Sequence, residues 1–148
     1  MFKRILIATD GSQLALRAVD GGLELAKSLG AEVVFVAVTE HWSMLEMTVD
    51  ARLGSPDPMT RYEQLAAAAA DRALGAACER AARAGMVVER CHVADRYPAE
   101  GIVAAAGEQG CDLIVMASHG RRGVRRLLLG SVANEVVCTA AVPVLVFR

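Results

Sequence analysis

Residues Ala117–Ser131 combine glycines, small polar residues and four arginines, with no acidic residue among them. The apolar run Leu113–Met116 precedes this segment and predicts a buried strand. Val132–Cys138, which follows it, predicts a helix. Glycines let a backbone approach a ligand closely, and the first turn of a helix presents unpaired N–H groups with a partial positive charge. This order of elements predicts a phosphate site, where Ser131 either caps the helix or hydrogen-bonds a phosphate oxygen.

The rest of the chain alternates between strand and helix patterns. Strands are predicted over Lys3–Thr9, Glu32–Val38, Met86–Val93, Asp112–Met116 and Ala141–Phe147. Helices are predicted over Leu14–Leu29 and Arg61–Ala84 and from Pro98 to Gly110, and a long loop over His41–Thr60. Such alternation predicts a parallel sheet with helices on both faces. Ligands of open sheets of this kind bind at the carboxyl ends of the strands.

Composition excludes several classes of protein. The 148 residues suit one domain, and 16 basic against 17 acidic side chains give no reason to expect nucleic acid or an anionic membrane as a partner. No apolar run approaches the ~18 residues of a membrane span. The chain enters a strand pattern directly after Met1, without a signal peptide, so we expect a cytoplasmic protein. Four separated cysteines without a C-x-x-C pair predict reduced thiols and no zinc site.

Four segments carry a resemblance to a known family: Ile5–Ser12, Asp112–Met116, Ser118–Arg121 and Val142–Val146. Together they resemble the universal stress proteins, specifically the members that bind ATP, and the resemblance covers the whole chain. The nucleotide pattern of that family is Gly, two residues, Gly, nine residues, Gly, then Ser or Thr. Gly120, nine intervening residues and Gly130-Ser131 match this pattern. Ala117 stands where the family has its first glycine.

The resemblance implies an α/β fold with a single Rossmann-like domain, a universal stress protein domain over residues 1–148. Its five parallel strands would have the order 3-2-1-4-5, with helices on both faces. The implied ligand is ATP, with or without Mg²⁺. Asp10 would lie near the ribose or the base, and Val38 against the adenine. The implied site consists of Thr9, Asp10, Val38, Met116, Ala117, Ser118, His119, Gly120, Arg122, Gly123, Gly130, Ser131 and Val132.

Each of these residues also has a plain structural interpretation. Asp10-Gly11-Ser12 is typical of a capped turn between a strand and a helix. The loop arginines form either a solvated surface or a cationic cradle for an anion. His119 has no predicted partner that would make it a general base, and it suits a turn residue. A methyl group at Ala117 is harmless if φ is negative there and no ligand atom approaches closely.

Three functions remain open. The first is a regulatory ATP-binding protein of the stress response. The second is a slow ATPase or phosphotransferase that uses the same cleft. The third is a dimeric interaction module in which Ala117 reflects loss of the nucleotide. The chain has no P-loop lysine motif and no G-x-G-x-x-G, which argues against a fast ATPase, a kinase or a dehydrogenase. At most, very slow ATP hydrolysis is expected.

The last predicted strand indicates a homodimer. Val142–Phe147 is apolar on both faces and would lie at the edge of the sheet. An exposed, apolar edge promotes aggregation unless another chain covers it. Similar family members pair this strand with its symmetry mate, so a homodimer through Val142–Phe147 is expected. Pro143 must then occupy a position that needs no N–H donor.

Overall fold

The computed structural model describes residues 1–41, 48, 52–54, 57–120 and 129–148. Five parallel strands form one sheet in the order β3-β2-β1-β4-β5, which confirms the predicted fold class and strand order. The strands are β1 (Arg4–Ala8), β2 (Glu32–Thr39), β3 (Glu89–Ala94), β4 (Leu113–Ala117) and β5 (Val144–Phe147). All of them therefore end at the same edge of the sheet.

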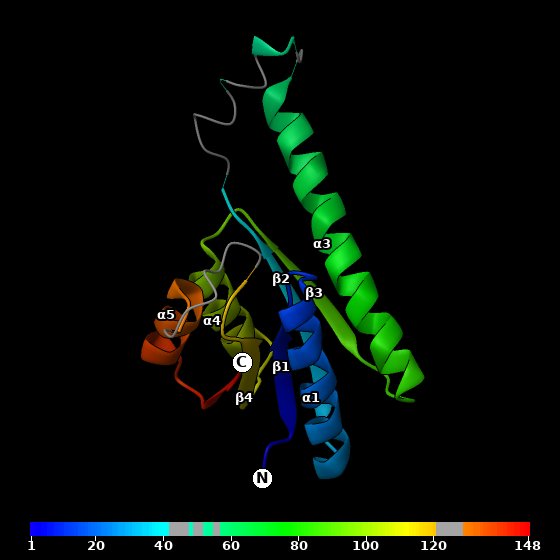
Figure 1. Cartoon of the computed structure of the whole chain (residues 1–148). Helices are drawn as coiled ribbons and strands as arrows, with labels where there is room; N and C mark the ends of the chain where they lie inside the picture. The colour runs from blue at the N-terminus through cyan, green and yellow to red at the C-terminus, as the bar shows by residue number, and fades with distance from the viewer. Residues whose placement is uncertain (42–47, 49–51, 55–56, 121–128) are drawn as a thin grey trace.

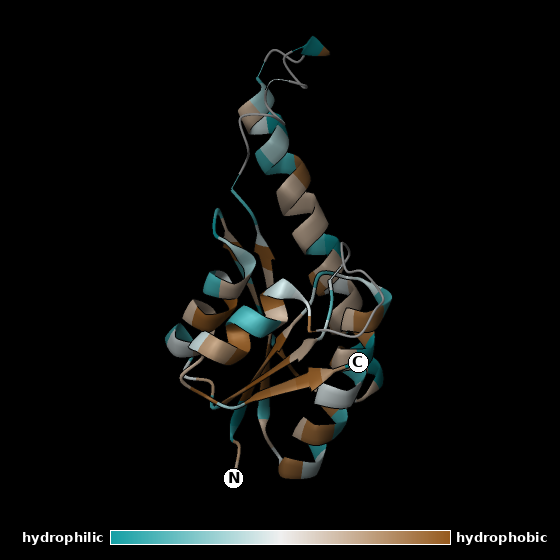
Figure 2. Cartoon of the chain, turned by 60° about the vertical axis from the view of Figure 1, so that its left-hand side comes forward, coloured by the Kyte–Doolittle hydropathy of each residue, from teal (hydrophilic) through white to brown (hydrophobic). Residues whose placement is uncertain are grey.

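The helices cover both faces of this sheet (Figure 1). They are α1 (Gln13–Leu29), α3 (Pro58–Arg83), α4 (Pro98–Glu108) and α5 (Ser131–Thr139). Alternate strand residues divide the core between the faces: Ile5 and Ile7 pack beneath α1 and α3, whereas Leu6 and Ile114 pack beneath α4 and α5. Figure 2 shows mostly hydrophobic strands, with helices that carry both hydrophilic and hydrophobic residues. Within the described residues, no helix has both the length and the apolar composition to cross a membrane.

Two predicted boundaries in the middle of the chain are wrong, each for a local reason. Helix α3 begins at Pro58 rather than Arg61, because the Asp57 carboxylate caps it by accepting the Thr60 N–H at 3.2 Å. The predicted strand over Met86–Val93 begins instead at Glu89. The Met86 N–H donates to the Ala81 carbonyl and so closes the end of α3. Most of the predicted loop, namely 42–47, 49–51 and 55–56, lies outside the described residues.

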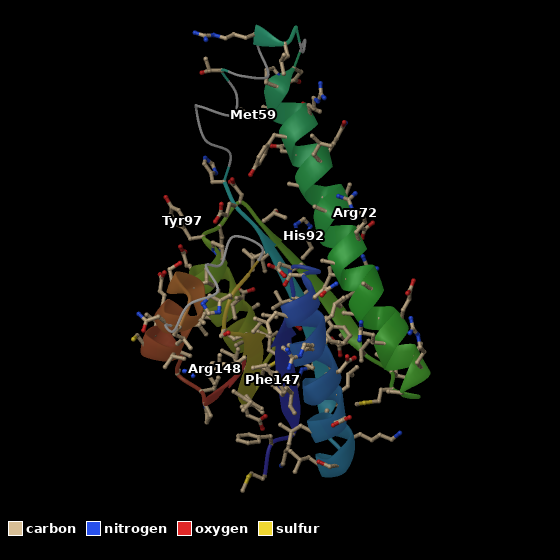
Figure 3. The ribbon with its side chains drawn as sticks, viewed as in Figure 1. Met59, Arg72, His92, Tyr97, Phe147 and Arg148 are labelled. Carbon is tan, nitrogen blue, oxygen red and sulfur yellow. The ribbon has the colours of Figure 1, made fainter. Side chains whose placement is uncertain are left out.

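The final strand is shorter than expected, because β5 begins at Val144 rather than Ala141. Pro143 stands immediately before it and contributes only its carbonyl, which accepts the Ile114 N–H at 3.0 Å. The Phe147 ring at the other end of β5 lies beside α1 (Figure 3). It packs directly over Gly21, where a Cβ would collide with the ring.

Candidate functional site

A cavity of about 500 Å³ opens at the carboxyl ends of β1, β2 and β4. The helix that follows β1 lies on one face of the sheet and the helix that follows β4 on the other. Ligands of open α/β sheets bind at such a topological switch point. The predicted residues that line the cavity are Thr9, Asp10, Val38, Met116, Ala117, Ser118, His119, Gly120, Gly130, Ser131 and Val132. Arg122 and Gly123, also predicted, lie outside the described residues.

Seven lining residues were not among the predicted ones: Ala8, Ala15, Val36, Glu40, Pro98, Ile102 and Ala133. Glu40 follows directly after β2, and Pro98 begins α4. The only signal in the sequence that could have indicated Glu40 and Pro98 as site residues is their place next to the predicted carboxyl edge of the sheet. They bring a carboxylate and an apolar helix turn to the cavity.

The turn after β1 holds the Asp10 carboxylate by local hydrogen bonds. The Ser12 N–H donates to Asp10 Oδ1 at 2.9 Å, and the Gly11 N–H donates to Thr9 Oγ1 at 3.2 Å. Ser12 in turn caps α1 by accepting the Ala15 N–H at 3.2 Å. Gly11 has φ +78°, a conformation in which side chains other than glycine are strained. The structural interpretation of this turn is therefore correct, and the same turn faces the cavity.

The loop after β4 passes directly over that turn. A Cβ on Gly120 would lie 2.9 Å from Asp10 Oδ2, so the glycine permits this close approach. Two segments about 110 positions apart in the sequence thus meet at one point of the cavity. The carboxylate and the glycine backbone form a narrow polar wall between β1 and β4.

Gly130 joins the loop after β4 to helix α5. Its N–H donates to the Ser118 carbonyl at 2.8 Å, and a Cβ there would lie 2.6 Å from that oxygen. Its φ is −58°, so the glycine is needed for close approach and not for an unusual dihedral. Gly130 also occupies the cap position, which makes the predicted capping role of Ser131 wrong: Ser131 is the first residue of the helix. The cap residue is a glycine and so offers no side chain to the first N–H groups of this helix, and Ser131 and Val132 of its first turn line the cavity.

Ser118 and His119 follow directly after β4. Ser118 is 3% exposed, and its Oγ is 2.9 Å from His119 Nδ1. The imidazole therefore has a partner within the loop. Both side chains line the cavity. This contact holds His119 in place, and its φ is not positive, so the structure does not support a turn residue with an unusual dihedral.

Ala117 fits its position without backbone strain. It is the last residue of β4, and Asp95 is the only described residue other than glycine with a positive φ. The Ala117 methyl packs in the core on the α1 side, whereas the preceding Met116 packs on the α4 and α5 side. A glycine is thus not required here by the conformation of the chain.

Charge in the described part of the cavity comes from the carboxylates of Asp10 and Glu40. The four loop arginines, Arg121, Arg122, Arg125 and Arg126, lie outside the described residues. Among the residues that are described, no group of three or more His, Cys, Asp or Glu side chains could hold a metal ion.

Comparison with known proteins identifies the family. The model of the universal stress protein family matches residues 1–148. The chain belongs to the universal stress protein family. A universal stress protein of Thermus aquaticus is 35% identical over 148 residues, with both chains fully covered.

Solved universal stress proteins share this architecture. The structure of the protein MJ0577 superposes with a TM-score of 0.78 at 27% identity, covering 99% of this chain and 96% of that one. A universal stress protein in complex with cAMP superposes with a TM-score of 0.68 at 26% identity, covering 99% and 97% of the two chains. That relative binds an adenine nucleotide.

Proposed function

We propose that this universal stress protein binds an adenine nucleotide, with ATP as the expected ligand, in the cavity at the carboxyl ends of β1, β2 and β4. One observation carries the proposal: the β1–α1 turn, the glycine that follows β4 and the uncapped start of α5 converge on that cavity. The cAMP complex of a relative supports an adenine nucleotide as the ligand class.

The proposal assigns each part of the nucleotide to a part of the cavity. The phosphates would accept hydrogen bonds from the N–H groups of Ser131 and Val132 at the start of α5. The ribose hydroxyls would donate to Asp10, whose carboxylate is already held in place by Ser12. The adenine would lie against Val38 at the apolar end of the cavity. The Gly130 N–H is not available, because it binds the Ser118 carbonyl.

Magnesium, in this proposal, arrives with the nucleotide. The described residues hold no cluster of metal ligands, so the phosphates would supply most of the coordination of a Mg²⁺ ion. Bound there, the ion would reduce the negative charge of the phosphates beside Asp10. We therefore expect the protein to bind ATP both with and without Mg²⁺.

Binding, and not turnover, is the proposed activity, in keeping with a regulatory role in the stress response. Fast phosphoryl transfer requires a positioned nucleophile and a metal held by carboxylates. Ser118 is the hydroxyl with a histidine beside it in the described cavity, and it is almost fully buried. We expect phosphate release far below the ~1 per second of working kinases.

Thermal denaturation tests the proposal. ATP at a hundred times its dissociation constant should stabilise the protein by about 2.7 kcal/mol, which raises Tm by several degrees. Ala117→Gly should bind ATP with the affinity of the unchanged protein, because the methyl lies in the core on the α1 side. No rise in Tm for either protein at millimolar ATP would refute nucleotide binding. A rise for Ala117→Gly alone would mean that this chain has lost its ligand.

A further inference from the structure

We propose that Gly101 of helix α4 sets the width of the slot that receives the base, and so acts as a positioning residue for nucleotide binding. This inference rests on the proposed function. Gly101 is buried and faces β2 and β3. A Cβ on Gly101 would lie 2.7 and 2.9 Å from the two Cγ atoms of Val38 and 3.3 Å from Val93 Cγ1. The helix can approach the sheet this closely only because residue 101 has no side chain.

The atoms that would meet the new methyl group cannot easily move away. Valine is branched at Cβ and has one strongly preferred side-chain rotamer in most settings, so its Cγ atoms are nearly as fixed as the backbone. Val38 also belongs to a strand that pairs with β1 on one side and β3 on the other. The helix, and not the strand, would therefore shift.

The part of α4 that would shift is a wall of the cavity. Pro98 and Ile102, in the first turns of the helix, line the cavity together with Val38 of the strand. Figure 3 labels Tyr97, the residue before this turn, beside the carboxyl edge of the sheet. The distance between Gly101 and Val38 thus fixes the separation of two apolar walls of the cavity, namely Val38 on the strand and Pro98 with Ile102 on the helix.

A planar base held between such walls gains dispersion contacts on both sides. A gap of 0.5–1 Å on one side removes roughly a quarter to a half of those contacts. Gly101→Ala should therefore weaken ATP binding roughly tenfold. Binding of inorganic tripolyphosphate, which has no base, should be unchanged. A general loss of structure would instead lower the affinity for ATP and the affinity for tripolyphosphate equally.

The same helix supplies a matched control. Gly107 is also helical, but no atom lies within 4 Å of a Cβ at that position. Gly107→Ala should therefore bind ATP and tripolyphosphate as the unchanged protein does. Titration calorimetry of the unchanged protein and both variants with each ligand gives the comparison.

A second pair of variants tests the contact itself, even if Gly101→Ala folds poorly. In a chain that carries Val38→Ala, the space for a methyl on residue 101 already exists. Adding Gly101→Ala to that chain should then leave its ATP affinity unchanged, so the two substitutions are not additive.

Three outcomes overturn the inference: equal ATP affinity of Gly101→Ala and Gly107→Ala, equal loss of affinity for ATP and tripolyphosphate in Gly101→Ala, or a further loss of ATP affinity when Gly101→Ala is added to Val38→Ala. If the unchanged protein binds tripolyphosphate but not ATP, the base slot does not exist and this inference is wrong. If it binds neither, the proposed function itself fails.

Discussion

Asp10 contributes to the fold through one carboxylate oxygen, and the other oxygen faces the proposed ligand. Oδ1 accepts the Ser12 N–H, while Oδ2 lies next to Gly120 at the cavity wall. Local side-chain hydrogen bonds of this kind are typical of turns and require no charge. A substitution that removes only the charge should therefore affect ligand binding, whereas one that removes the whole side chain should also affect the stability of the fold.

Asp10→Asn should leave the fold stable and weaken ATP binding roughly fivefold. The amide oxygen can still accept the Ser12 N–H, but the bond to the ribose loses its charge, which is worth about 1 kcal/mol. Asp10→Ala should in addition lower the free energy of unfolding by about 1 kcal/mol. Calorimetric titration and urea unfolding measure the two effects. Tighter ATP binding by Asp10→Asn would mean that the carboxylate faces the phosphates and not the ribose.

At the scale of elements, α1 packs against the sheet through glycine. A Cβ on Gly22 would lie 2.6 Å from Ile7 Cδ1 and 3.3 Å from Val115 Cγ1. Both side chains are fully buried, so neither has free space into which to move. Gly75 in α3 differs, because no atom lies within 4 Å of a Cβ there.

Alanine should therefore have opposite effects at these two helical glycines. Gly22→Ala should lower the free energy of unfolding by about 1 kcal/mol or more through overpacking. Gly75→Ala should raise it by about 0.5–1 kcal/mol, because alanine favours a helix over the unfolded chain. Midpoints of urea unfolding give both values. A Gly22→Ala protein as stable as the unchanged one would show that α1 does not pack this closely.

Most elements could be predicted because each has a local cause. Ile5–Ala8 is an unbroken apolar run, and Ser12 and Gly30 mark the two ends of α1 in the sequence as in the structure. The start of α3 was misplaced because Pro58 after Asp57 resembles a break, although proline is well suited to the first turn of a helix. Gly101 could not be recognised at all, because its contact with Val38 arises only when α4 packs on β2.

The same distinction holds for the candidate site. The segments that follow β1 and β4 carry local patterns, whereas Glu40 and Ile102 reach the cavity only through the packing of the whole sheet. Gly130 was predicted for phosphate binding and lines the cavity, but a Cβ there would also collide with the Ser118 carbonyl, which is 12 positions earlier in the sequence. Spacing in a sequence cannot show such a contact.

At the scale of the whole molecule, Asp112 links the start of β4 to the start of the chain. Its Oδ2 accepts the Lys3 N–H at 2.8 Å and its Oδ1 accepts the Arg4 N–H at 3.1 Å. The bond from Lys3, and then the one from Arg4, favours the charged carboxylate and lowers the pKa of Asp112. The folded protein therefore holds this proton less tightly than the unfolded chain does.

This shift predicts how stability depends on pH. The contribution of Asp112 is complete above the pKa of the unfolded chain, about 3.9, and is lost as the pH falls through the lower pKa of the folded state. Asp112→Asn should thus destabilise the protein at pH 7 and have a smaller effect near pH 3. Urea unfolding at the two pH values tests this. An equal effect at both would show that the carboxylate charge contributes nothing.

We propose a homodimer through β5, at the end of the described sheet. β5 is the last strand of the sheet, and Leu145 within it is 39% exposed. Its outer edge can pair with a second copy about a twofold axis. We expect sedimentation velocity at micromolar concentration to show a dimer, and Leu145→Lys to shift it to monomer. A monomer from the unchanged chain would refute pairing through this strand.

Isothermal titration of the unchanged protein with ATP tests the central claim most directly. The predicted result is saturable binding of one nucleotide per chain, and Gly120→Ala should bind more weakly, because its new methyl displaces the Asp10 carboxylate 2.9 Å away. The claim that this cavity is a nucleotide site would be contradicted if millimolar ATP gave no heat of binding, with or without Mg²⁺, and if cAMP and tripolyphosphate gave none either.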